Sequence, residues 1–449
     1  MEIVGLSILV LLIIFGSSQN WKLSIKTILV IVLFEGALRR WFFPQARDLI
    51  YFLKDFILIG AYIGFARRSR QIVDRYPFIK ELTITITIVC CLQSFNPSLG
   101  SPIIGLLGIR AYLLYIPLMW IIPHLFDSGS ELYTFLRNYL FLLIPICILG
   151  IVQFFSPIDS LLNMYTAGSE EGIATAGEFV RITGTFSYLQ GLKVYLAVCF
   201  SLLVVLLSQA YSIKWKLIYI LELTLIIVNC FMSGSRAVII YIFLFTIIYF
   251  ICLLFNSYKT AINFIYRLFL PIVITILIAT IYFQPAIQSY TNRADTAGDS
   301  VVDRAFGYFN EILIFSKDRI DGYGTGATQG GAASLRQLFD LPVGEKLPPY
   351  EEEPGRVMLE IGLLGFGLWY GLRLVILISL YCVFFELKNP FYKKLALAVF
   401  LFQLIHVGRQ LVTDPTMLPY FWFFSGFIYL LPNLESQETK KIRIDQANI

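Results

Sequence analysis

The chain of 449 residues carries little charge. Asp, Glu, Lys and Arg make up 14% of it, against about 25% in an ordinary soluble domain. Hydrophobic residues account for 57%, and the mean hydropathy is +0.74. This composition excludes a soluble globular protein. The net charge of +5 is small, so the sequence indicates no nucleic-acid-binding surface.

Residues that commonly bind metals or act as nucleophiles are also scarce. The sequence has two histidines, His124 and His406, and no His, Cys or carboxylate group at metal-ligand spacing. We therefore expect no metal and no other cofactor. All seven cysteines fall within apolar runs, which predicts buried thiols without a disulfide framework. The nucleophile elbow of a serine hydrolase is missing.

Long apolar runs dominate what is present, and a spanning helix needs about 20 such residues. The first run lacks the basic segment and cleavage site of a signal peptide, so we interpret it as a span. The sequence predicts an all-α fold, a polytopic transmembrane bundle of about 12–13 spans. The thirteen apolar segments are 3–16, 22–34, 49–66, 79–95, 103–123, 133–155, 190–209, 213–231, 237–255, 265–283, 356–385, 391–405 and 415–431.

Lysine and arginine distribution predicts the orientation of these spans. One set of alternate connections, together with the C-terminal tail, is short and holds 17 basic residues, so we expect it to be cytoplasmic. The opposite set contains every long connection and still holds 15 basic residues. Positive charge on the outer side suggests an anionic ligand there.

The predicted organisation has four parts. N-terminal spans occupy residues 1–155, and central spans with a short outer loop occupy 156–283. A large, partly helical extracytoplasmic loop covers 284–355, and C-terminal spans with a cytoplasmic tail cover 356–449. An insert of 72 residues is long enough to be a functional cap rather than a connector.

Three arginines stand at or inside predicted spans, where they are costly and usually face a cavity or a partner. Arg110 and Arg373 interrupt spans and can alternatively extend to lipid headgroups. Arg236 follows Ser-Gly-Ser at an outer helix end, which leaves backbone N–H groups open to an anion.

The mouth of the eleventh predicted span carries three consecutive carboxylates, Glu351, Glu352 and Glu353. We interpret them either as a charged segment of the surface or as a group in which one carboxylate, with a pKa adjusted by its neighbours, accepts a proton. Arg356 precedes Glu360 by one helical turn, so we expect these two to pair. His406 starts the last outer loop, where a general base can reach an outer site.

The order of several weak motifs resembles the O-antigen ligase and O-antigen polymerase superfamily of bacterial envelope glycan assembly. The resemblance covers about 180–370. Its motifs are Arg181-Ile-Thr-Gly-Thr-Phe, Ser233-Gly-Ser-Arg-Ala, an outer loop containing Arg304 and Gly322-Tyr-Gly-Thr-Gly, and Glu360-Ile-Gly-Leu-Leu-Gly.

This resemblance implies a metal-independent, membrane-embedded glycosyltransferase of the plasma membrane, with an active site facing the periplasm or the cell exterior. Arg236 and Arg304 would bind the diphosphate of an undecaprenyl-linked donor, because guanidinium groups must then stabilise the leaving group. Further outer arginines would line the same cavity; they are Arg181, Arg356 and Arg409.

Ligases of the superfamily have a histidine shortly before the Glu-x-Gly-Leu-Leu-Gly motif, where this chain has Glu351 to Glu353. The difference favours an inverting polysaccharide polymerase in which one of these carboxylates accepts the acceptor proton. The implied partners are the lipid-linked donor, a glycan acceptor, membrane lipids, and a chain-length regulator and flippase of the same pathway. Alternatives are a ligase that transfers finished glycan, a flippase or exporter, and a membrane scaffold.

Overall fold

A computed structural model describes residues 2–68, 75–165, 173–176, 179–209, 212–256, 258–285, 287–288, 291, 311–316 and 319–447. Helices dominate these residues, and their only strands form one antiparallel pair, β1 with β2. In chain order the elements are α1 (Glu2–Gln19), α2 (Trp21–Ala37), η1 (Leu38–Phe42), η2 (Pro44–Ala46), α3 (Arg47–Ala66), α4 (Pro77–Gln93), η3 (Pro97–Leu99), α5 (Pro102–Leu113), α6 (Leu118–Ile121), η4 (Ile122–His124), α7 (Gly129–Phe141), α8 (Leu143–Phe155), β1 (Thr175–Ala176), β2 (Phe179–Val180), α9 (Leu189–Leu207), α10 (Ile213–Met232), α11 (Arg236–Asn256), α12 (Tyr258–Tyr282), α15 (Ala332–Phe339), α16 (Glu353–Glu386), α17 (Pro390–Ile405), α18 (Met417–Ser425) and α19 (Phe427–Ala447).

The predicted all-α polytopic membrane bundle is confirmed. Each of the thirteen predicted apolar segments overlaps a helix. Among the described residues, seven helical stretches are long and apolar enough to cross a membrane, fewer than the 12–13 expected. Helices α2, α4 and α17 have only 16 or 17 residues, α18 has 9, and the described apolar parts of α1 and α12 are Gly5–Gln19 and Ala261–Val273. The seven are Pro44–Ala66, Pro102–His124, Gly129–Phe155, Leu189–Leu207, Ile213–Met232, Arg236–Asn256 and Glu353–Glu386.

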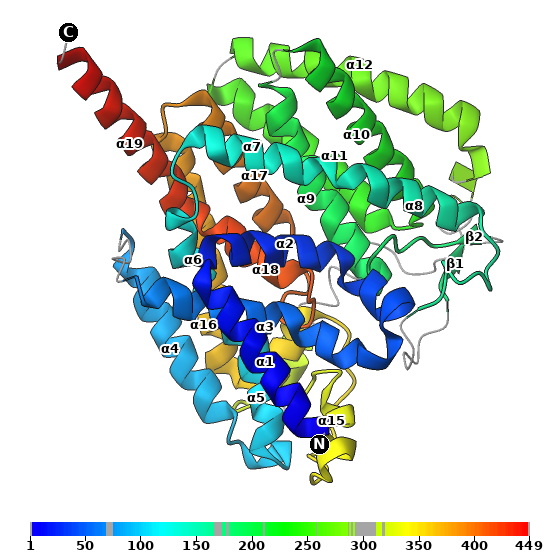
Figure 1. The fold of residues 1–449 in the computed structure, drawn as a ribbon, viewed down its shortest axis with the longest axis vertical. Helices are drawn as coiled ribbons and strands as arrows, with labels where there is room; N and C mark the ends of the chain where they lie inside the picture. The colour runs from blue at the N-terminus through cyan, green and yellow to red at the C-terminus, as the bar shows by residue number, and fades with distance from the viewer. Residues whose placement is uncertain are drawn as a thin grey trace.

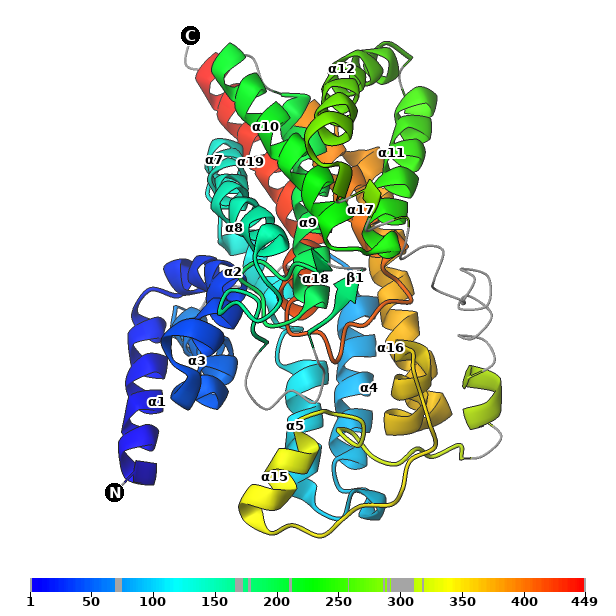
Figure 2. The same cartoon turned by 90° about the vertical axis from the view of Figure 1, so that its right-hand side faces the viewer.

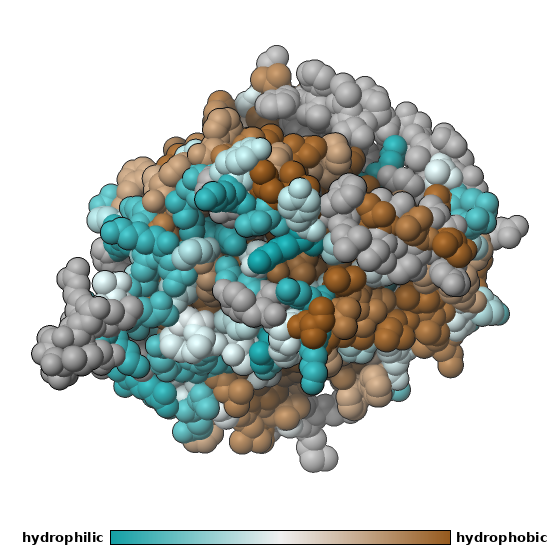
Figure 3. All heavy atoms as spheres, turned by 90° about the horizontal axis from the view of Figure 1, so that it is seen from above, coloured by the Kyte–Doolittle hydropathy of each residue, from teal (hydrophilic) through white to brown (hydrophobic). Residues whose placement is uncertain are grey.

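Helix α9 forms the centre of the bundle. Its apolar window is 83% buried, more than in any other of these stretches, and it packs against α10, α11 and α17. Apolar residues occur on every face of α9, so the helix can bury its whole circumference. Apolar side chains also cover large areas of the outside, as the brown surface in Figure 3 shows, with hydrophilic ones gathered towards the left of that view. A surface of this kind suits contact with lipid.

Connections between helices lie at two opposite ends of the bundle. At the end where α19 terminates, here named the tail end, Lys22 lies 2.7 Å from Asp127 and Arg75 pairs with Glu386. Because successive predicted spans cross the membrane in opposite directions, the connections that carry these residues are expected on the same side of it. Figure 1 places the free end of α19 and the β1–β2 hairpin on opposite sides of the molecule.

The remaining connections meet at the other end, here named the insert end. There Ser98 donates a 2.7 Å hydrogen bond to Glu345, and Arg40 donates one of 2.8 Å to Thr183. Each of these hydrogen bonds joins two loops that the sequence assigns to the same side of the membrane. Which end faces the cytoplasm stays a prediction.

Candidate functional site at the insert end

The Thr-Gly-Thr turn of the Arg181 motif is held by two buried side chains. Arg40 in the π-helical turn η1 donates to Thr183 Oγ1 and to the Gly184 carbonyl at 2.8 and 2.6 Å. Gln153 at the end of α8 accepts from the Gly184 N–H at 2.7 Å. Gly184 has φ +58°, a conformation that glycine adopts without strain. The turn is therefore fixed between the ends of α2 and α8.

This fixed turn directs Arg181 to the Ser-Gly-Ser-Arg motif between α10 and α11. Arg181 Nε donates to the Ser233 carbonyl at 3.0 Å. Gly234 has φ +59°, which lets the chain turn sharply before α11 begins at Arg236. Arg236 is half-buried, and within the described residues its side chain makes no hydrogen bond or ion pair. Arg181 and Arg236, both predicted to bind an anion, thus lie at the same turn. Arg181 is bound to the Ser233 carbonyl, whereas Arg236 has no such partner among the described residues.

His406 connects this turn to the end of α17. Its ring lies 4.8 Å from that of Tyr241, which is on α11 shortly after Arg236. His406 Nδ1 lies 2.8 Å from the Phe402 carbonyl. A carbonyl only accepts, so this contact assigns the proton to Nδ1 and leaves the lone pair on Nε2. The exposed Arg409 follows in the same loop.

The three glutamates of the predicted charge run have different surroundings. Glu353 is fully buried; its Oε1 accepts from the Val412 N–H at 3.0 Å and lies 3.8 Å from Arg373. Glu352 is half-buried, and Glu351 is exposed. Only Glu351 is thus free to meet a large solute. Arg373 is itself buried, so it does not extend to headgroups.

The predicted pair of Arg356 and Glu360 does not form, and this expectation was wrong. The guanidinium of Arg356 instead lies 4.8 Å from the ring centre of Tyr350. Glu360 is buried and accepts from both the N–H and the hydroxyl of Thr328 at 2.9 Å. A helical spacing of four residues allowed the pair, but the Glu360 carboxylate is directed to the loop around Thr328 instead.

The glycine loop and the Glu-x-Gly motif form one structural unit. Gly362 breaks α16 with φ +69°, which frees the carbonyls before it. The Tyr323 and Gly324 N–H groups donate to the carbonyls of Leu359 and Glu360 at 2.6 and 3.0 Å. The approach is so close that a Cβ on Gly322 would lie 2.6 Å from the Gly362 nitrogen. Figure 2 shows the loop against α4, α5 and α16.

A salt bridge within the insert, together with hydrogen bonds to Ser98, fastens the insert to the turn before α5. Arg319 Nη1 lies 2.6 Å from Glu345, and its Nη2 donates to Ser98 Oγ at 2.7 Å. The hydrogen bond from Ser98, supported by the one from Arg319, holds the pKa of Glu345 below its ordinary value of 4.5. At neutral pH this carboxylate is therefore charged and attached.

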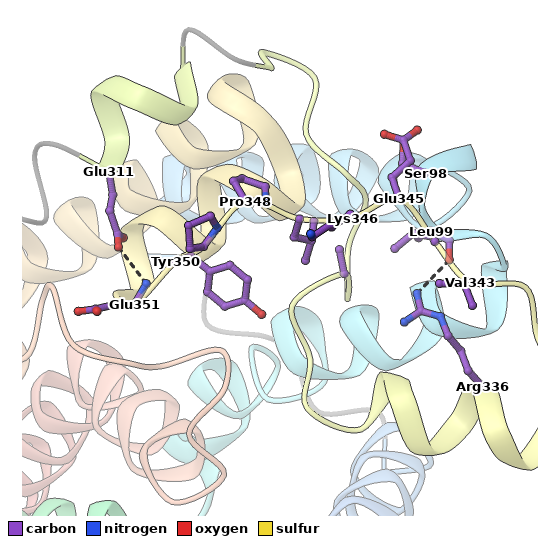
Figure 4. A pocket seen from close by; sticks show the side chains of 14 residues that line it. Ser98, Leu99, Glu311, Arg336, Val343, Glu345, Lys346, Pro348, Tyr350 and Glu351 are labelled. Carbon is purple, nitrogen blue, oxygen red and sulfur yellow. Dashed lines mark hydrogen bonds between the residues drawn. The ribbon is translucent and has the colours of Figure 1, made fainter. Parts of the chain in front are cut away.

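A cavity of about 1110 Å³ opens beside this salt bridge. Figure 4 shows Glu351, Tyr350, Pro348 and Lys346 along one wall and Arg336 of α15 at the other side. Glu311 accepts the Glu351 backbone N–H at 2.9 Å, which fixes this part of the wall. A tyrosine and prolines beside carboxylates and cations can bind the apolar faces and the hydroxyl groups of a sugar.

Sequence reasoning missed a buried network between α2, α3 and α5. Lys54 Nζ lies 2.5 Å from Glu35, and Arg110 Nε lies 2.6 Å from Asp55. Both cations are 4.7 Å from the centre of the Tyr51 ring. Adjacent Lys54 and Asp55 within an apolar run were the available signal, because charges there usually have partners.

Arg304, the second predicted diphosphate ligand, lies outside the described residues; within the insert that was expected to be partly helical, residues 311–316 and α15 are helical. Among the described residues, no group of three or more His, Cys, Asp or Glu is arranged to hold a metal ion.

No protein-family model matches the chain, and no curated protein matches it significantly. The resemblance to O-antigen ligases and polymerases therefore rests on the sequence motifs alone.

Proposed function

We propose that this multi-pass membrane protein is a glycosyltransferase that polymerises oligosaccharide repeats linked to undecaprenyl diphosphate. Its product would be O-antigen, capsule or exopolysaccharide. The main support is the contact of Arg181 with the Ser233 carbonyl, beside a half-buried Arg236 that has no carboxylate partner among the described residues. A half-buried guanidinium without such a partner is suited to a phosphate ligand.

The reaction is an inverting, metal-independent transfer. An acceptor hydroxyl oxygen bonds to the anomeric carbon of the donor while the bond from that carbon to the diphosphate oxygen breaks. The hydroxyl proton passes to a protein base, and the lipid diphosphate leaves. Arg236 and Arg304, assisted by Arg181, stabilise the charge that develops on the leaving group. Arg356 and Arg409 extend the basic surface of the same end.

Glu351 is our choice as the proton acceptor, because it lines the large cavity at the insert end and is exposed to solvent. Glu353 is unsuited to this role, since it is fully buried beside Arg373. His406 Nε2 is the second candidate, because its lone pair is free and its ring is near α11. The cavity wall around Tyr350 would bind the acceptor glycan.

The proposal places the protein in the plasma membrane, with the insert end facing the periplasm or the exterior. Its substrates are a lipid-linked oligosaccharide donor and a glycan acceptor, and its pathway partners are a flippase and a chain-length regulator. The related alternative is a ligase that transfers finished glycan to a lipid or protein acceptor.

The test is glycan length in cells that carry Arg236→Ala, with Arg236→Lys to separate charge from bidentate geometry. Lys216→Ala, an exposed cation at the tail end, is the control. At equal protein level we expect single repeats from Arg236→Ala and normal polymer from the control. Long chains left on the lipid carrier would identify a ligase instead, and normal polymer from Arg236→Ala would contradict both activities.

A further inference from the structure

A second cavity lies at the tail end, far from the glycan site in the fold. It has a volume of about 420 Å³ and is formed by residues of α9, α11, α12 and α17 with the loop ends beside them. Its lining includes apolar side chains, Leu253 and Phe264 among them, and the two cations Arg267 and Lys394. Among the described residues, no acidic one lines it.

Both cations contact Ser208, the residue that follows the end of α9. Arg267 Nη1 donates to the Ser208 carbonyl, and Lys394 Nζ lies 3.1 Å from Ser208 Oγ. Neither forms an ion pair within the described residues. Two like charges held at one residue repel each other, so their arrangement favours an anion between them.

Carboxylates do reach this end, but they are engaged elsewhere. Glu435 of α19 accepts the N–H groups of Lys388 and Asn389 at 2.9 and 2.5 Å. Glu438 accepts from the Tyr392 hydroxyl at 2.5 Å. Both thus stabilise the start of α17 and leave the two cations uncompensated.

Exposed aromatic residues locate the cavity relative to a bilayer. Phe255, Tyr258 and Tyr266 are 87%, 67% and 75% exposed on the tail-end parts of α11 and α12. Aromatic side chains in such positions concentrate at the membrane–water interface. The cavity therefore opens at headgroup depth, with its apolar wall reaching towards the hydrocarbon.

We propose that this cavity binds the headgroup and upper acyl chains of an anionic phospholipid. Arg267 and Lys394 bind the phosphate, and the wall around Leu253 and Phe264 accepts the chains. Basic pockets between membrane helices recognise such headgroups. The apolar wall favours a lipid over a free phosphate ion, and the site is independent of the proposed glycan transfer.

Native mass spectrometry of the detergent-purified protein tests the proposal by comparing phosphatidylglycerol with phosphatidylcholine. We expect the wild type to prefer phosphatidylglycerol, and the Arg267→Gln/Lys394→Gln variant to bind it about thirty-fold more weakly, since each cation near anionic lipid contributes ~1 kcal/mol. Lys216→Gln, at the same end but outside the cavity, should bind as the wild type does. Equal binding of the two lipids, or unchanged binding by the double variant, would overturn the proposal.

A second measurement distinguishes the lipid from a soluble anion and guards against misfolding. If inorganic phosphate raises the midpoint of thermal unfolding as much as phosphatidylglycerol does, the ligand is a free anion and the lipid assignment fails. If the double variant is not monodisperse, Lys394→Gln alone is compared, with an expected loss of about five-fold. Retained affinity in that variant then counts against the site.

Discussion

Glu353 and Arg373 are twenty positions apart on α16, yet their side chains lie 3.8 Å from each other. Twenty residues of a straight helix would extend about 30 Å. The chain must therefore reverse between them, and the break at Gly362 is where it does so. The first part of α16 folds back along the second, which brings the buried carboxylate to the arginine and to the loop around Val412.

Replacement of Gly362 by alanine tests this reversal. Its φ of +69° and ψ of −176° form a region open almost only to glycine, and an added Cβ would lie 2.4 Å from the Ile320 carbonyl oxygen. We expect a loss of about 1–3 kcal/mol in unfolding free energy. Gly367→Ala is the matched control, because nothing lies within 4 Å of its added Cβ. Equal unfolding midpoints for both variants in detergent would contradict a strained reversal.

The buried pair itself should be strongly coupled. Glu353→Gln leaves Arg373 charged, buried and without its carboxylate, which costs about 3–5 kcal/mol. Adding Arg373→Met should recover much of this loss, because no unpaired charge then remains. Unfolding of the two single variants and the double variant gives the coupling energy. Arg75→Gln, which breaks a partly exposed pair with Glu386, should change stability by about 1 kcal/mol or less. Purely additive effects at Glu353 and Arg373 would count against the contact.

Apolar segment lengths predicted the helices well, because a run of about 20 apolar residues reports membrane crossing directly. The same pattern could not reveal the reversal at Gly362, since the residues around it are apolar on both sides. The pairing of Lys54 with Glu35 could not be predicted either, because it depends on how α2 packs against α3. Pairing between segments distant in sequence leaves no local periodicity.

Of the candidate site, the sequence supplied residue types but not their surroundings. Arg181 and Arg236 were expected near one ligand, and their turns do meet. The run Glu351 to Glu353 looked uniform, yet its members range from exposed to fully buried. Glu353 is buried through its contact with the loop at Val412, 59 positions away in the sequence. The residues next to Glu353 therefore do not reveal its burial.

Glu351 and Glu352 provide a matched pair for the proposed proton acceptor. If Glu351 removes the acceptor proton, Glu351→Gln should lower the rate of polymerisation about 100-fold or more. Glu352→Gln, one residue away and outside the cavity lining, should retain most activity. Transfer measured with a lipid-linked donor separates the two outcomes. Full activity of Glu351→Gln, combined with loss in His406→Gln, would move the role to His406.

Acid should loosen the attachment of the insert to the turn at Ser98. The pKa of Glu345 is lowered in the folded protein, so its contribution to stability is complete above the ordinary value of 4.5 and is lost as the pH falls through the lowered value. Hydrogen exchange of residues 319–345, corrected for intrinsic rates, should therefore increase below that pH. In Glu345→Gln the exchange should be faster at neutral pH and lack this dependence. Identical pH profiles would refute the assignment.

The contact between Gly322 and Gly362 leaves no room for a side chain, so movements of the loop at Gly322 and of the tip of α16 are coupled. Arg319, three residues before Gly322, ties this loop to Glu345 on the rim of the large cavity. In the proposed polymerase, a force that a bound glycan exerts on this rim would therefore reach α16, and through α16 Arg373, which donates to the His406 carbonyl.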